Sequence, residues 1–331
     1  MSSDRQIGLA GALGLWAAVA FAAALYGTWL GYGGRGFAVT LGVFAFFLAA
    51  EILVAARGVR ERLADLFDSR RRLSPALALV PIPLFAYLIY ALGTHSFLWW
   101  RVGIATLFVV LPSLLAASAR QRPFGAWQDY AALMAIWVPV KFRVLQPLWP
   151  YPDGRLGYAL TVLLALSVAM VAFLFVRGLD GVGYTIAWGR GVASAVVVNF
   201  VPLGVILIVL GEWIGFIRYG PSYGQLESLP LVALGIFFFT AWTEEFLFRG
   251  LLQNLLCRTL RSSTIGWLAA SVIFGFAHIP NGGFPNWRYV LLAAIAGVFY
   301  GRAWRQTGSM FASALVHMLV DVTWHFFFRT L

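Results

Sequence analysis

Ionisable side chains stand next to one another inside an apolar stretch of the C-terminal third of the sequence. Glu244 and Glu245 follow the run from Leu231 to Trp242, and Arg249 comes four residues after Glu245. Residues i and i+4 of a helix share a face, so Glu245 and Arg249 are spaced to form an ion pair, whereas Glu244 points about 100° away. A buried carboxylate without a partner suits a general acid or base. The pattern predicts a structural ion pair, Glu245 with Arg249, beside a catalytic Glu244.

Histidines form a second set in the following apolar runs. His278 ends one run directly before Pro280, and an imidazole there can share a water molecule with Glu244. His317 and Asp321 occupy positions i and i+4 of the last run, with His325 two turns after His317 and about 80° off the same face. We therefore expect a site that combines carboxylates and imidazoles from three neighbouring helices.

Each of these groups also has a structural interpretation when it is taken alone. A buried glutamate and arginine can simply join helices, a histidine can hydrogen-bond a carbonyl, and Asp321 can serve only to orient His317. An ionisable residue inside a membrane span costs at least about 2.5–3.5 kcal/mol on insertion scales. Three of the four histidines and three of the thirteen acidic residues share these runs, which argues for a functional site over packing alone.

The composition indicates a protein whose solvent is lipid. Hydrophobic residues make up 61% of the 331 and charged residues 11%, against about 45–50% and about 25% in soluble domains. The single cysteine, Cys257, excludes an intrachain disulfide and a cysteine-based metal site. Although the net charge is +11, the arginines cluster beside apolar runs, where they meet anionic headgroups. We expect membrane lipid as a partner and no nucleic acid.

Apolar runs of about 20 residues suffice to cross a bilayer as helices, and about ten or eleven are present. They are 7–30, 37–56, 74–92, 98–119, 129–148, 157–176, 191–216, 229–257, 264–279, 287–304 and 309–329. Pro139, Lys141, Arg143 and Pro147 interrupt the fifth run, which leaves crossing, re-entrant and interfacial arrangements open for it. The expected fold is an all-α, polytopic transmembrane helical bundle.

The arginine clusters test the number of spans and the orientation. With eleven spans they all fall on one side: residues 57, 60, 62, 70–72, 120, 122, 177, 190, 258, 261, 302 and 305. The positive-inside rule then predicts a cytoplasmic N-terminus. We expect two domains, accessory transmembrane helices over residues 1–190 and a catalytic transmembrane domain over residues 191–331.

The motif residues, in their order along the chain, resemble a known family. These are Glu244-Glu245-Phe246-Leu247-Phe248-Arg249-Gly250, then Phe274 with His278, then His317 with Asp321. Together they resemble the CPBP family of CAAX-processing and bacteriocin-processing intramembrane proteases, relatives of the Rce1-type prenyl-protein endopeptidases. The similarity covers about residues 191–329. It implies a multi-pass protein of the bacterial cytoplasmic membrane that cleaves membrane-anchored proteins or peptides.

The resemblance also implies roles for the motif residues. Glu244 and His278 would activate water, and His317 with Asp321 would stabilise the oxyanion. The family motif more often ends in asparagine, whereas an ionised aspartate can only accept hydrogen bonds. Asp321 must therefore be protonated to bind an oxyanion, or it orients His317 instead.

Other interpretations stay open at this point. No cofactor is expected, but two histidines with carboxylates can bind zinc, although the sequence lacks HExxH and the resemblance favours a glutamic mechanism. A proton-coupled transporter or channel would use the same titratable groups as a relay. A non-catalytic immunity or scaffold protein would keep the fold without the chemistry.

Overall fold

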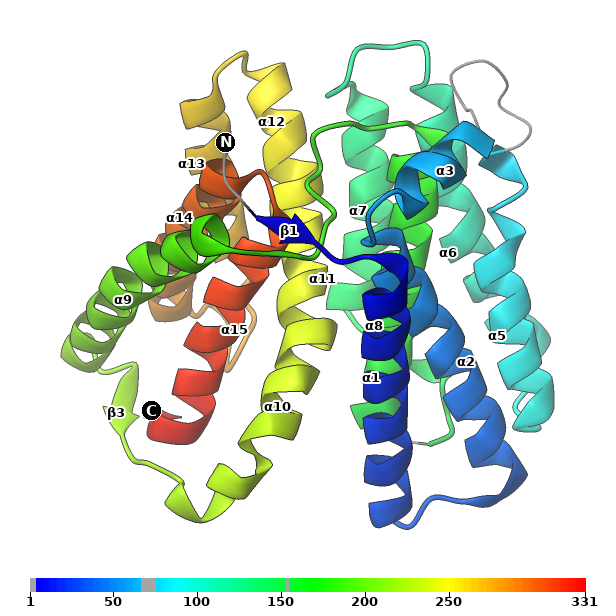
Figure 1. Ribbon diagram of the computed structural model, residues 1–331, viewed down its shortest axis with the longest axis horizontal. Coiled ribbons are helices and arrows are strands. Elements are labelled where there is room, and N and C mark those ends of the chain that lie inside the picture. The colour runs from blue at the N-terminus through cyan, green and yellow to red at the C-terminus, as the bar shows by residue number, and fades with distance from the viewer. Residues whose placement is uncertain (1–3, 67–75, 153–154) are drawn as a thin grey trace. The chain divides into compact units, whose positions relative to one another are not determined.

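The protein is almost entirely helical (Figure 1). The computed structural model describes residues 4–66, 76–152 and 155–331, so Arg70 to Arg72 and the start of the run at Ser74 lie outside the described residues. Two short antiparallel ribbons, each of two strands, are the only sheets in the described ranges. The prediction of an all-α, polytopic helical bundle is confirmed.

The chain divides into two compact units, Ile7–Asp180 and a second made of Met1–Gln6 with Gly181–Leu331. The roles expected for residues 1–190 and 191–331 stay predictions. The first unit contains α1 (Leu9–Trp29), α2 (Gly34–Val54), α3 (Val59–Leu66), α5 (Pro81–Gly93), α6 (Trp99–Ser118), α7 (Trp127–Lys141), η1 (Gln146–Leu148), α8 (Arg155–Ala169) and the π-helix η2 (Met170–Val176).

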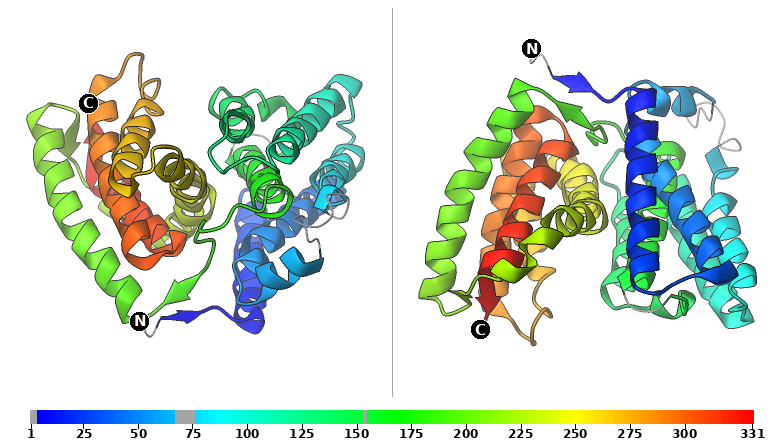
Figure 2. Two further views of the ribbon diagram at one scale, coloured as in Figure 1. Left: turned by 90° about the horizontal axis from the view of Figure 1, so that it is seen from above. Right: turned by 60° about the horizontal axis from the view of Figure 1, so that its bottom comes forward.

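The second unit carries all of the predicted site residues. Its elements are β1 (Arg5–Gln6), β2 (Ala187–Trp188), α9 (Arg190–Trp213), β3 (Ile217–Tyr219), η3 (Tyr223–Ser228), α10 (Leu229–Ile236), η4 (Phe237–Ala241), α11 (Trp242–Glu245), η5 (Phe246–Gln253), α12 (Asn254–Thr259), α13 (Ser263–Phe276), α14 (Trp287–Thr307), α15 (Met310–Phe327) and β4 (Phe328–Thr330). Helix α14 packs against α13, α9 and α15, as Figure 2 shows for α9, α14 and α15.

Seven helices in the described residues are long and apolar enough to cross a membrane. They are Leu9–Trp29, Gly34–Val54, Trp99–Ser118, Leu156–Val176, Arg190–Trp213, Tyr223–Thr259 and Met310–Phe327. The other four predicted runs also form helices, but α5, α7 and α13 have only 13, 15 and 14 residues. The fourth, α14, has 21 residues and carries Arg288, Arg302 and Arg305. The chain is therefore a multi-pass membrane protein with shorter helices between its long spans.

Burial within the first unit separates its core from its lipid-exposed surface. The span Leu156–Val176 is 94% buried, whereas Leu9–Trp29 is 11% buried. Large apolar side chains of α1, such as Phe21 and Trp29, are exposed. An exposed helix that is apolar on all sides is stable only where the surrounding medium is hydrocarbon.

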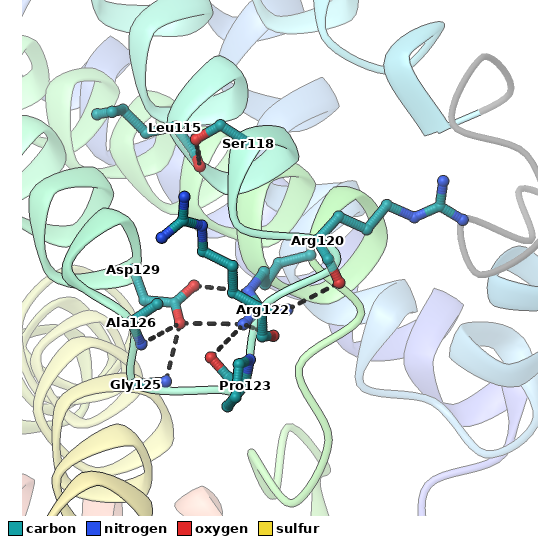
Figure 3. A network of polar contacts seen from close by, with 9 residues as sticks. Leu115, Ser118, Arg120, Arg122, Pro123, Gly125, Ala126 and Asp129 are labelled. Carbon is teal, nitrogen blue, oxygen red and sulfur yellow. Dashed lines mark hydrogen bonds and ion pairs between the residues drawn. The ribbon is translucent and has the colours of Figure 1, made fainter.

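A buried ion pair joins Arg177, directly after the span Leu156–Val176, to Asp129 in the first turn of α7. The Nε of Arg177 lies 2.6 Å from the Oδ1 of Asp129, and both side chains are almost fully buried. The Nη2 of Arg177 also donates to the carbonyl oxygens of Arg122 and Pro123, each at 3.0 Å. Figure 3 shows the Asp129 carboxylate, which in addition accepts from the backbone N–H of Gly125 at 2.8 Å.

We expect Asp129→Asn to destabilise the protein, because it leaves the guanidinium of Arg177 buried without its counter-charge. Removing one partner of a buried pair costs about 3–5 kcal/mol. Thermal unfolding of the detergent-solubilised protein measures the effect. Glu61→Gln is the matched control, since Glu61 pairs with Arg60 on an exposed surface of the same unit. Equal melting temperatures for the two variants would contradict the assignment.

Candidate active site

The segment that carries Glu244 and Glu245 is an irregular helix. The four-residue α11 (Trp242–Glu245) lies between two π-helical stretches, η4 (Phe237–Ala241) and η5 (Phe246–Gln253). π-helical turns are rare and are found frequently at functional sites. The widened turns change the angle between side chains before and after the glutamates, so this span can direct side chains toward more than one neighbouring helix.

Glu245 is fully buried and its carboxylate is held by three side chains. Its Oε2 lies 3.0 Å from the Nε of Arg249, which confirms the predicted pairing at i and i+4. Its Oε1 lies 3.0 Å from the Nδ1 of His317 on α15. The hydroxyl of Ser313, one turn earlier on α15, also donates to Oε2. Glu245 therefore joins its own helix to α15 as well as pairing with Arg249.

Aromatic rings line this polar centre. The guanidinium of Arg249 lies 4.6 Å from the centroid of the Phe274 ring. Tyr300 on α14 stacks on His317 with ring centroids 4.5 Å apart and an interplanar angle of 16°. Phe274 and Tyr300 are fully buried. Rings on two sides of Arg249 and His317 limit the access of water and fix the plane of the imidazole.

Glu244 differs from its neighbour in both exposure and bonding. The residue is partly exposed, and its Oε2 is a buried atom that no hydrogen-bond donor reaches within the described residues. This agrees with the expectation that Glu244 lacks a partner on its own helix. A carboxylate oxygen that the protein leaves unsatisfied is available to a water molecule or a substrate.

His278 lies just beyond the end of α13, in the turn that follows Phe276. Its Nδ1 is 2.8 Å from the carbonyl oxygen of Phe274, and its ring lies 4.7 Å from the Phe274 ring. A carbonyl only accepts, so this contact assigns the proton to Nδ1 and leaves Nε2 as the acceptor in the neutral ring. The turn after α13 thus places His278 against Phe274. The ring of His317 packs on the same phenylalanine, with ring centroids 5.9 Å apart.

Asp321 lies on the other side of the His317 ring. Its Oδ2 is 3.5 Å from the Nε2 of His317, and 36% of its side chain is exposed. Both nitrogens of His317 therefore face carboxylates, with Glu245 on Nδ1 and Asp321 on Nε2. This geometry supports the orienting role for Asp321. His325 is exposed and takes no part in the site.

Three residues that the sequence interpretation did not select belong to this site. Ser313 stands four residues before His317 on the same helical face, a spacing that could have indicated it. Tyr300 and Tyr289 come from α14, in which no ionisable motif drew attention to them. Their positions follow from the packing of α14 against α13 and α15.

The donor groups do not assemble into a metal site. The Glu245 oxygens already contact Arg249, Ser313 and His317, and the Nδ1 of His278 faces a carbonyl. In the part of the chain that the structure describes, no group of three or more His, Cys, Asp or Glu residues could hold a metal ion. The chemistry proposed below uses the side chains alone.

The two adjacent glutamates should respond differently to the same substitution. Glu245→Gln leaves Arg249 buried without a charge partner, and we expect a loss of about 3–5 kcal/mol in the free energy of unfolding. Glu244→Gln changes a carboxylate that carries no ion pair, so its melting temperature should stay close to that of the unsubstituted protein. Thermal unfolding in detergent compares the two variants. A larger loss for Glu244→Gln would show that the roles are reversed.

Comparison with known proteins agrees with the sequence and the geometry. Residues 226–323 match the family model described as type II CAAX prenyl endopeptidase Rce1-like, and this range includes Glu244, His278, His317 and Asp321. Neither the curated proteins nor the solved structures gave a significant match. The resemblance found in the sequence is confirmed over residues 226–323, the segment that carries the candidate site.

Proposed function

We propose that the protein is an intramembrane endopeptidase in which Glu244 and His278 activate a water molecule. The proposal rests on contacts among motif residues that come from three helices. Glu245 contacts His317, and Phe274 contacts both His278 and His317. Glu244 adds a carboxylate oxygen that no protein donor occupies. The match to an endopeptidase family supports the same reaction class.

In the proposed reaction Glu244 accepts a proton from water while the water oxygen bonds to the carbonyl carbon of the scissile peptide. The Nε2 of His278 accepts a hydrogen bond from the same water, because its Nδ1 proton is directed at the Phe274 carbonyl. The carbonyl oxygen becomes an oxyanion. When the C–N bond breaks, Glu244 passes its proton to the leaving nitrogen, which releases an amine and a carboxylic acid.

His317 stabilises the oxyanion in this proposal by sharing its Nε2–H, which lies 3.5 Å from the Oδ2 of Asp321, with the substrate oxygen, and Asp321 orients the ring. Glu245 and Asp321 face the two ring nitrogens of His317, so the ring plane is fixed before substrate arrives. A donor held in place costs no reorganisation when negative charge develops, and this is a large term in acyl-transfer catalysis. Glu245 and Arg249 position the imidazole and do not touch the substrate.

The substrates in this proposal are proteins or peptides anchored in the membrane, because the site belongs to a multi-pass protein with long apolar spans. We place the protein in a bacterial cytoplasmic membrane with its N-terminus in the cytoplasm. The helices over residues 1–190 then serve as an accessory domain that docks the substrate. A proton-coupled transporter or a non-catalytic scaffold is less well supported, since the motif residues match an endopeptidase family.

Substitution of the water-activating residues tests the proposal. We expect Glu244→Gln and His278→Ala to reduce cleavage of membrane-anchored peptides about 10²–10⁴-fold, the usual contribution of general acid–base catalysis. A library of such peptides in liposomes, read by mass spectrometry, measures the effect. His325→Ala is the control, because His325 is an exposed histidine on the same helix as His317.

Full activity in Glu244→Gln or His278→Ala would overturn the mechanism. The same assay with a strong chelator addresses zinc, since a structural or catalytic metal makes activity depend on metal loading. We expect no loss after chelation. Loss that added zinc restores would instead support the metal-dependent version.

A further inference from the structure

The site as described lacks one hydrogen-bond donor for the oxyanion. Acyl-transfer enzymes commonly direct more than one donor at the developing negative charge. An asparagine at the end of the last motif would offer an N–H, but Asp321 offers none when it is ionised. The protein therefore needs another donor near Asp321 and His278, on a side chain that substrate can reach.

Tyr289 occupies this region. It lies in the first turn of α14, where its backbone N–H donates to the side-chain oxygen of the capping residue Asn286 at 3.1 Å. Its ring lies 4.9 Å from the ring of His278 and stacks on Trp324 of α15, with centroids 6.1 Å apart and an interplanar angle of 23°. Three elements thus hold the phenol in one orientation.

The groups around the Tyr289 hydroxyl are those of the proposed active site. Its ring contacts His278 and Trp324, and Trp324 lies three residues after Asp321 on α15. The side chain of Asn281 is within hydrogen-bonding reach of the phenol. The residue is only partly buried. A phenol oxygen can accept from an amide N–H and still donate its own proton to another acceptor.

The loop between His278 and Tyr289 fixes this arrangement. The backbone N–H of Asn286 donates to the carbonyl oxygen of Ile279 at 2.9 Å, and the Asn286 amide donates to the carbonyl oxygen of Asn281 at 2.8 Å. The backbone N–H of Asn281 in turn donates to the carbonyl of His278 at 3.0 Å. Asn286 therefore sets the position of Asn281 relative to Tyr289.

We propose that the Tyr289 hydroxyl is a catalytic donor that stabilises the oxyanion together with His317, in the role that an asparagine at position 321 would otherwise fill. This inference rests on the proposed peptidase activity. The phenol keeps its proton throughout: it strengthens its hydrogen bond as the carbonyl oxygen becomes negative and weakens it as the carbonyl forms again. No bond to Tyr289 is made or broken.

Tyr300, the other tyrosine in this centre, does not suit this role. It is fully buried and stacks on His317 at 4.5 Å, so substrate cannot reach its hydroxyl without displacing the imidazole. Tyr289 combines partial exposure with ring contacts to His278 and Trp324. Tyr289 is therefore placed to donate to the substrate, whereas the ring of Tyr300 only packs against its neighbours.

The test compares three variants on one membrane-anchored peptide that the unsubstituted protein cleaves. Tyr289→Phe keeps the ring and removes the hydroxyl, so we expect kcat to fall about 10²–10³-fold, as for the loss of one oxyanion donor, with KM little changed. Adding Asp321→Asn to Tyr289→Phe should restore part of kcat, because the amide supplies an N–H at the same oxyanion. Tyr223→Phe, which alters an exposed tyrosine of the same unit, should leave kcat unchanged.

The outcomes separate this inference from the proposed function. Cleavage by the unsubstituted protein together with its loss in Glu244→Gln establishes the peptidase, whatever Tyr289 does. Full kcat in Tyr289→Phe would then show that only the ring matters and would overturn the inference. A fall in kcat that Asp321→Asn fails to relieve would assign the hydroxyl to holding Asn281 and would also overturn it.

Discussion

The fully buried carboxylate of Glu245 is the constraint on which the candidate site depends. A charge in this position is tolerated only when its oxygens are paired with donors. Arg249 supplies the counter-charge from the same helix, and His317 and Ser313 supply donors from α15. Because these partners come from two helices, the span Tyr223–Thr259 and α15 can pack in only one register without leaving an ion unpaired. The orientation of His317 follows from the same contacts.

Two adjacent glutamates can divide their tasks because helical neighbours point in different directions. Glu245 has its oxygens engaged by protein groups, so it is fixed and unavailable to substrate. No donor among the described residues reaches the Oε2 of Glu244, and this residue is partly exposed. The π-helical turns on both sides of α11 allow Glu245 to point toward α15 while Glu244, the proposed water-activating residue, points in another direction.

Local spacing accounts for what the sequence could predict. The pair of Glu245 with Arg249 and the shared face of His317 with Asp321 follow from helical periodicity alone, and both contacts occur. The contact of Glu245 with His317 joins residues 72 positions apart, so no spacing rule could reveal it. Tyr289 reaches His278 through a loop whose path depends on Asn286. Hydropathy does not show where a helix ends, so the run predicted over residues 264–279 forms α13 with only 14 residues.

The charge balance of the site explains why an aspartate can replace an asparagine at position 321. Glu244, Glu245 and Asp321 contribute three carboxylates, and Arg249 is the fixed cation among the groups that contact them. An asparagine would remove one negative charge and offer the Nε2 of His317 only a neutral amide oxygen as acceptor. Asp321 offers a charged acceptor, which in the proposed mechanism orients the Nε2–H of His317 beside the substrate carbonyl. The aspartate thereby strengthens His317 as a donor, but it donates no hydrogen bond to the substrate itself. In the proposed mechanism a neutral donor such as a phenol supplies the second hydrogen bond to the oxyanion without adding charge to the site.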